Sequence, residues 1–280
     1  MAAARHYFQP TTIYLHTNAQ DGVLRQAKAG LNGLWSKLIL EMPGVQVRKA
    51  VAPSHARNGQ NITIVEHKSD FVRVEAVLKY GGVYMDFDAH PLRDVRVLRH
   101  AGFQGIVGRQ LGGEVMSGTF MSTKGSKMMQ RWAEDMHQVY DGGWTTHSNA
   151  VINRVAEKLV AEPGEALIME REAFGPGSWT PEDCIKLYGL HDDTFNMNLT
   201  GTTQRVELGQ SQTNPSWAID WSKNYFLHAF SPSRTGTHID GFDQITPKYV
   251  LERRSNFAIA VYPIARKMFE QRLYNIDDPY

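Results

Sequence analysis

The segment 83–88 (VYMDFD) constrains the fold of this chain most strongly, because its side chains alternate between apolar and polar. Successive side chains of a β-strand point to opposite faces of the sheet. The three apolar side chains would then pack against a helix, while Tyr84, Asp86 and Asp88 line the opposite face. We therefore expect a strand that ends in two neighbouring carboxylates.

The segment 69–80 predicts a helix directly before this strand. Ser69 is a good N-cap, Asp70 suits the first turn, and apolar residues recur at helical spacing after them. Gly81 and Gly82 then end the helix. The expected strand thus follows a helix of defined length.

The same alternation of helix and strand patterns continues along the chain. Strands are predicted at 12–16, 45–51, 61–65, 105–107, 118–121 and 225–230. Helices are predicted at 22–42, 127–139, 148–160 and from 246 onward, with a break at Pro263. The segment 175–216 predicts a loop. We expect an α/β fold, with a mixed, mainly parallel sheet flanked by helices, in a single domain at 1–280 that includes a C-terminal helical segment at 245–280.

Composition excludes several classes of protein. The 30 basic and 29 acidic residues give a net charge of +1 without a basic stripe, so we expect no nucleic-acid partner. One cysteine permits no internal disulfide. The longest nearly apolar run, 257–265, is shorter than the ~20 residues of a spanning helix, and 1–10 lacks the apolar region of a signal peptide. The chain as written is expected to be soluble, with membrane association only through a segment absent from it.

The two carboxylates of the DxD triplet have two interpretations. A chain with 15 aspartates contains about one such triplet by chance, so the triplet alone could be a solvated strand end. In open α/β sheets, however, ligands bind outside the carboxyl ends of strands. Asp86 and Asp88 could there hold one hard divalent cation that keeps open positions for phosphate oxygens.

The segment 67–95 (HKSDFVRVEAVLKYGGVYMDFDAHPLRDV) closely resembles the DXD sugar-binding region of glycosyltransferase family 32. That family includes α-1,6-mannosyltransferase-like and capsular-polysaccharide transferases. Its pattern is S-D-x-x-R, a helix, Y-G-G-x-Y-x-D-x-D and a Pro-Leu turn, and every element is present. Weaker similarity continues at 117–122, 144–149 and 224–230. The resemblance implies a GT-A-like, Rossmann-type fold, a nucleotide-sugar donor, a glycan-type acceptor, a divalent metal (Mn²⁺, with Mg²⁺ as the alternative) and retention of anomeric configuration.

The resemblance also assigns roles to particular residues. The catalytic and metal-binding carboxylates would be Asp86 and Asp88, with His228 as a further metal ligand. The residues expected to contact the nucleotide sugar are Asp70, Arg73, Gly81, Gly82, Tyr84 and Asp86. Further contacts to acceptor or donor are expected from Ser117, Gly118, His147, Ser148 and Asn149.

Structural alternatives stand beside these roles. Arg73 could form an ion pair with Asp70 or Glu66 instead of contacting the donor. His228 could be a packed strand histidine, since Ala229-Phe230 follows it where relatives commonly have a tryptophan.

Two further groups of residues have similar alternatives. Ser148 or Asn149 could cap the helix that follows, and Ser117 and Gly118 could form a turn.

Relatives usually begin with an I-P-x-x-I-H strand that helps hold the base, whereas this chain starts at what resembles the next strand, 12–16.

Three functions remain open on these grounds. The first is a metal-dependent, retaining glycosyltransferase that moves a sugar to a glycan, lipid or other acceptor. The second is a catalytically weakened sugar-nucleotide or glycan-binding module of the same fold. The third is a phosphoryl-transfer enzyme, which predicts further carboxylates beside the DxD triplet. The resemblance implies the Golgi or secretory lumen for full-length eukaryotic relatives and the cytoplasm for a bacterial protein.

Overall fold

The computed structural model describes residues 1–191 and 216–279, which divide into two compact units. Unit 1 consists of Met1–Ser178 and Asn224–His228, and unit 2 of the described parts of Trp179–Lys223 and Ala229–Tyr280. Helices and strands alternate as predicted, so the α/β fold class is confirmed. A single glycosyltransferase domain at 1–280 stays a prediction.

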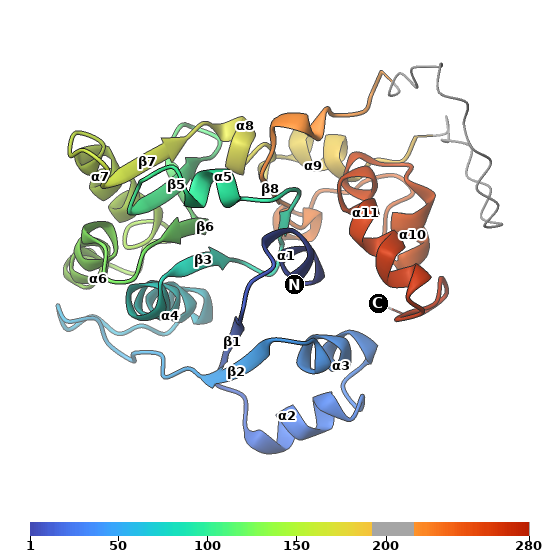
Figure 1. Ribbon diagram of the computed structural model, residues 1–280, viewed down its shortest axis with the longest axis horizontal. Coiled ribbons are helices and arrows are strands. Elements are labelled where there is room, and N and C mark those ends of the chain that lie inside the picture. Colours follow the sequence, from blue (N-terminus) through green and yellow to red (C-terminus); the bar gives the residue numbers. More distant parts are fainter. Residues whose placement is uncertain (192–215, 280) are drawn as a thin grey trace. The chain divides into compact units, whose positions relative to one another are not determined.

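Unit 1 contains most of the secondary structure (Figure 1). Its helices are α1 (Ala2–Phe8), α2 (Asp21–Lys28), α3 (Leu34–Glu41), α4 (Val65–Tyr80), α5 (Arg96–Arg99), α6 (Lys127–Val139), α7 (Asn149–Leu159) and α8 (Arg171–Phe174). Its strands are β1 (Ile13–Thr17), β2 (Val45–Lys49), β3 (Gly82–Met85), β4 (Ala89–Pro91), β5 (Gly105–Arg109), β6 (Val115–Ser122), β7 (Ala166–Met169) and β8 (Phe226–His228).

The central sheet of unit 1 has the strand order β3-β6-β5-β7. Strand β6 runs antiparallel to both β3 and β5, whereas β7 runs parallel to β5. Two smaller sheets pair β1 with β2 in parallel and β4 with β8 antiparallel. The sheets are therefore mixed, as expected. The expectation that they are mainly parallel is wrong, since three of the five strand pairings in the described residues are antiparallel.

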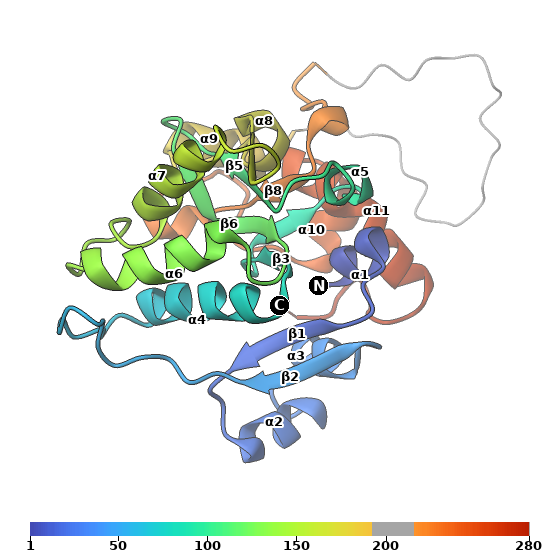
Figure 2. The same ribbon diagram turned by 60° about the vertical axis from the view of Figure 1, so that its left-hand side comes forward.

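Two hydrophobic clusters cover the opposite faces of the central sheet. Helices α4, α6 and α7 supply most of the first cluster, and α1, α5 and α8 supply half of the second. Figure 2 shows α4 and α6 side by side along one face. The paired residues Val107 and Phe120 belong to the first cluster, and the adjacent pair Ile106 and Met121 to the second. Because successive strand side chains point to opposite faces, the central sheet contributes to the hydrophobic core on each of its two faces.

The predicted helix at 22–42 is wrong, because the structure contains two helices there, α2 and α3. Gly30 and Gly33 lie between them with φ of 85° and 92°. A helix cannot pass through residues in this region of φ, and glycine adopts it at no steric cost. The apolar spacing was therefore correct for each half but did not reveal the interruption.

The predicted strand at 61–65 and the predicted cap at Ser69 are also wrong. Asn61 forms only an isolated bridge with His55, and α4 already begins at Val65. Ser69 consequently lies inside the helix. Tertiary packing explains the difference, because His67 is buried, so the face of α4 that packs into unit 1 starts before Ser69.

Unit 2 is helical in its described part, with α9 (Pro181–Tyr188), α10 (Pro247–Glu252), α11 (Asn256–Glu270) and the short 3₁₀ helices η1 (Trp221–Lys223) and η2 (Pro232–Thr235). The predicted break at Pro263 is wrong, since this residue lies within α11 on its exposed side. The chain instead breaks at Arg253, which has φ 54°. The predicted loop 175–216 contains α9, and its residues 192–215 lie outside the described ones. Among the described residues, no helix has the length and apolar character needed to cross a bilayer.

Candidate metal and donor site

The DxD residues lie in a turn that directly follows β3. The strand ends at Met85, so the predicted strand 83–88 is too long by three residues. The backbone N–H of Asp86 donates to the carbonyl of Gly118 (2.8 Å), and the N–H of Ala89 donates to the carbonyl of Asp86 (3.0 Å). This turn, rather than strand alternation, brings the two carboxylates together.

Gly81 determines how the chain enters β3. It ends α4 with φ 69°, and a Cβ at this position would lie 2.7 Å from the backbone nitrogen of Lys124. A side chain is therefore excluded both by backbone conformation and by the close approach of the neighbouring turn. The predicted glycine stop is confirmed.

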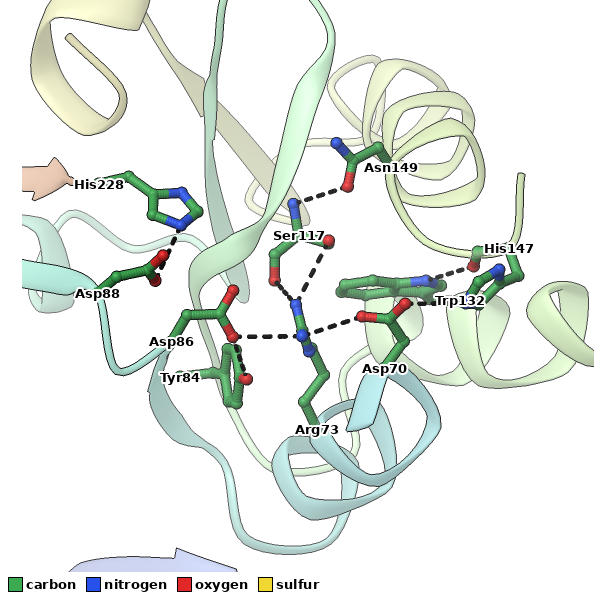
Figure 3. A network of polar contacts seen from close by, with 10 residues as sticks. All are labelled: Asp70, Arg73, Tyr84, Asp86, Asp88, Ser117, Trp132, His147, Asn149 and His228. Carbon is green, nitrogen blue, oxygen red and sulfur yellow. Dashed lines mark hydrogen bonds and ion pairs between the residues drawn. The ribbon is translucent and has the colours of Figure 1, made fainter. Parts of the chain in front are cut away.

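Asp86, Asp88 and His228 form a group that could hold a metal ion (Figure 3). Each offers one ligand atom, and these atoms lie within 4.8 Å of one another. His228 reaches the site because β8 pairs with β4, which places it opposite Ala89. Within 1–191 and 216–279, no other group of three His, Cys, Asp or Glu side chains has this geometry.

Gly118 lies against two of the three candidate ligands. A Cβ added to it would be 2.6 Å from Cε1 of His228 and 2.9 Å from Oδ2 of Asp86. The cluster can therefore assemble only where β6 carries no side chain. The turn alternative for Ser117 and Gly118 is wrong, since both lie within β6.

Burial and hydrogen bonding determine the protonation of two acidic groups at the site. Burial by itself would raise the pKa of Asp88, but the hydrogen bond from His228 (3.1 Å) and the charge of that imidazole outweigh burial and lower the pKa. Burial raises the pKa of Tyr84 strongly, so its hydroxyl stays protonated and donates to Oδ1 of Asp86 at 2.5 Å. The site thus presents an ionised Asp88 beside an anchored Asp86.

Arg73 joins helix α4 to the DxD turn. Its Nη2 lies 3.0 Å from Oδ1 of Asp70 and 3.2 Å from Oδ1 of Asp86. Its Nη1 donates to the carbonyl of Ser117 at 3.0 Å, and the guanidinium lies over the ring of Tyr84. Burial alone would lower the pKa of Arg73, but the surrounding acidic groups raise it. The ion pair expected with Asp70 is therefore present, and it also includes Asp86.

The two residues directly before α7, His147 and Ser148, are buried. His147 is completely buried, and its Nε2 lies 2.8 Å from Oδ2 of Asp70. Asn149 accepts a hydrogen bond from the N–H of Ser117 (3.3 Å) through its side-chain oxygen. Ser148 stands at the N-cap position of α7 without a side-chain capping bond. The roles of His147, Ser148 and Asn149 as substrate contacts stay predictions. The structure adds a direct contact between His147 and Asp70.

Sequence patterns did not point to His67 and Tyr140, which extend this network. His67 is buried, and its Nδ1 lies 3.0 Å from the hydroxyl of Tyr140. The rings of His67 and His147 have centroids 4.6 Å apart. His67 is separated from Tyr140 and His147 by 73 positions or more, so no local motif could have revealed the cluster.

Part of the chain is similar to a known protein family. Residues 16–104, about a third of the chain, match a family described as "Glycosyltransferase sugar-binding region containing DXD motif". No curated protein matches the chain. Among solved structures, "PaToxG Glycosyltransferase" is similar with a TM-score of 0.35 and 13% identity, over 54% of this chain and 69% of that one. This family match, over residues 16–104, confirms the resemblance to the family 32 type of glycosyltransferase.

Proposed function

We propose that the chain is a retaining glycosyltransferase that moves a sugar from a nucleotide-sugar donor to a glycan, lipid or related acceptor with the help of a divalent metal. One observation carries the proposal. Asp86, Asp88 and the sequence-distant His228 offer three ligand atoms within 4.8 Å, and the two carboxylates are the DxD pair of the matched region.

The ligand types favour Mn²⁺ over Mg²⁺. Carboxylates suit both ions, but Mg²⁺ is usually held by oxygen alone, whereas imidazole is a common ligand of transition metals. When bound, such an ion would neutralise the negative charge that develops on the departing diphosphate.

Asp86 is oriented so that one of its oxygens remains for the metal. Its Oδ1 accepts from Tyr84 (2.5 Å) and faces Nη2 of Arg73 (3.2 Å). Its Oδ2 lies on the side of Gly118 and His228. Charge-assisted bonds of this kind hold a ligand in place before the metal arrives and lower the reorganisation that binding requires.

The donor contacts form the remaining part of the proposal. Asp70, Arg73, Tyr84 and the turn at Gly81 and Gly82 would together shape the donor pocket beside the metal. A phosphoryl-transfer enzyme is not favoured, since the metal group of the described residues includes no carboxylate beyond the DxD pair.

The test is hydrolysis of a panel of nucleotide sugars with Mn²⁺. The double variant Asp86→Asn and Asp88→Asn keeps side-chain size and is expected to reduce turnover at least ~100-fold, because two charged ligands are lost. The control is Asp135→Asn, which removes an exposed carboxylate paired with Arg154. Undiminished turnover in the double variant would overturn the metal site. Tight binding of nucleotide sugars by the wild-type protein without any turnover would favour the binding module.

A further inference from the structure

Four side chains form a continuous line of polar contacts that ends at the DxD turn (Figure 3). His147 Nε2 lies 2.8 Å from Oδ2 of Asp70, and Asp70 Oδ1 lies 3.0 Å from Nη2 of Arg73. The same Nη2 lies 3.2 Å from Oδ1 of Asp86. We call His147, Asp70, Arg73 and Asp86 the buried chain.

We propose that His147 is a positioning residue for the metal ligand Asp86 and that it acts through Asp70 and Arg73. The inference rests on the proposed metal site for the role of Asp86. The contacts among the other three residues stand independently of it.

Burial makes each contact of the chain difficult to replace. His147 is 0% exposed, Asp70 7% and Arg73 8%. Water therefore does not replace a partner that is lost, and an unpaired buried charge costs several times more than an ordinary hydrogen bond contributes. The chain consequently favours one arrangement of its side chains.

Asp70 couples the position of His147 to that of Arg73, because each of its two carboxylate oxygens has a different partner. Its Oδ2 contacts His147 and its Oδ1 contacts Arg73, so the carboxylate plane is held at both edges. The terminal torsion of an aspartate is otherwise broad. Without the imidazole, Asp70 can turn. Arg73 then loses one of the contacts that fix the direction from which it holds Oδ1 of Asp86, while the carbonyl of Ser117 and the ring of Tyr84 still hold it.

His147 is itself rigidly placed. Its ring stacks on Phe71 with an interplanar angle of 7° and a centroid distance of 5.5 Å, and the ring of His67 lies 4.6 Å away. Its backbone carbonyl accepts a hydrogen bond from the indole of Trp132 (3.3 Å). A carboxylate only accepts, so Nε2 of His147 carries the proton and donates to Asp70. A rigid donor of this kind can determine the orientation of its partner.

The experiment measures the Mn²⁺ dissociation constant of three variants by calorimetry. The amide nitrogen of a glutamine can take the place of Nε2, whereas that of an asparagine corresponds to Nδ1 and stops short of Asp70. We expect His147→Gln to bind Mn²⁺ within about threefold of the wild-type protein, and His147→Asn and His147→Leu to bind about tenfold more weakly, as for partners that orient metal ligands elsewhere.

The control is His137→Leu, which changes another buried histidine outside the chain. His137 accepts from the backbone of Arg57 (3.3 Å) and packs against Phe71. We expect this variant to lose stability but to keep its affinity for Mn²⁺. A general loosening of the core would weaken Mn²⁺ binding in this variant too, which would overturn the inference.

The possible failures are distinguishable. A wild-type protein that does not bind Mn²⁺ overturns the proposed metal site and this inference with it. Normal binding by the wild-type protein, with the same dissociation constant for His147→Gln and His147→Asn, overturns the inference alone. If His147→Leu does not fold, the comparison of the glutamine and asparagine variants decides.

Discussion

Replacing Gly118 by alanine is the most direct structural test of the metal site. The added Cβ would lie 2.6 Å from Cε1 of His228 and 2.9 Å from Oδ2 of Asp86, where ordinary contacts are 3.4 Å or longer. The imidazole must then move by about 0.8 Å and the carboxylate by about 0.5 Å, whereas metal–ligand distances tolerate only about 0.2 Å. The groups that move are the proposed ligands themselves.

The expected result is at least a tenfold weaker binding of Mn²⁺ by Gly118→Ala, which corresponds to about 1.4 kcal/mol. Overpacking should also lower the free energy of unfolding by about 1–3 kcal/mol. Backbone strain is not the cause, because Gly118 lies outside the left-handed region of φ. Calorimetric titration with Mn²⁺ and urea unfolding measure the two effects separately.

The matched control is Gly177→Ala. A Cβ there would lie 3.6 Å from the carbonyl oxygen of His228, which is an ordinary contact near the same residue. This variant should bind Mn²⁺ as the wild-type protein does. The reasoning is refuted if Gly118→Ala, folded, binds Mn²⁺ with the wild-type dissociation constant.

Three predictions concern stability. Gly81→Ala should lower the free energy of unfolding, measured in urea, by about 1–3 kcal/mol, because the position has φ 69° and no space for a Cβ. An unchanged free energy of unfolding would contradict the turn at this position. Phe71→Ala should cost about 3–5 kcal/mol, since the ring is fully buried, whereas Val97→Ala at an exposed site should change stability by less than about 0.5 kcal/mol. Burial lowers the pKa of His137, and the charge of Arg57 lowers it further, so the folded state favours the neutral ring. The stabilisation that the neutral ring contributes is fully present above the ordinary histidine pKa of about 6.5. It is lost as the pH falls toward the folded-state pKa. The free energy of unfolding in urea, measured between pH 7.5 and 5, should therefore decrease less steeply with falling pH for His137→Gln than for the wild-type protein. An equal pH dependence of the two proteins would contradict the assignment.

Local sequence information predicted the elements whose signals lie within a few residues. The helix at 127–139 was predicted with its observed bounds, and the helix beginning near Ser148 and the strand after Gly82 were located correctly. Capping residues, glycine stops and hydrophobic periodicity all act over one or two turns. The same signals predicted the α/β fold class, whereas the role of the DxD pair came from the family resemblance of the segment 67–95.

Other boundaries depended on packing that the sequence does not display. Helix α4 begins at Val65 rather than at Ser69, because its buried face already includes His67. The glycines that divide 22–42 adopt a conformation that apolar spacing does not report. In each case, burial and backbone conformation outweighed a local preference.

The sequence by itself determined which residues could bind a metal, and only the tertiary structure decided how they are assembled. His228 stands 140 positions from Asp88, and pairing of β8 with β4 brings them within 3.1 Å. His147 stands 77 positions from Asp70, yet their contact begins the buried chain. Sequence motifs record side-chain chemistry and local geometry, whereas such contacts arise from the pairing of strands and the packing of helices that are distant along the chain.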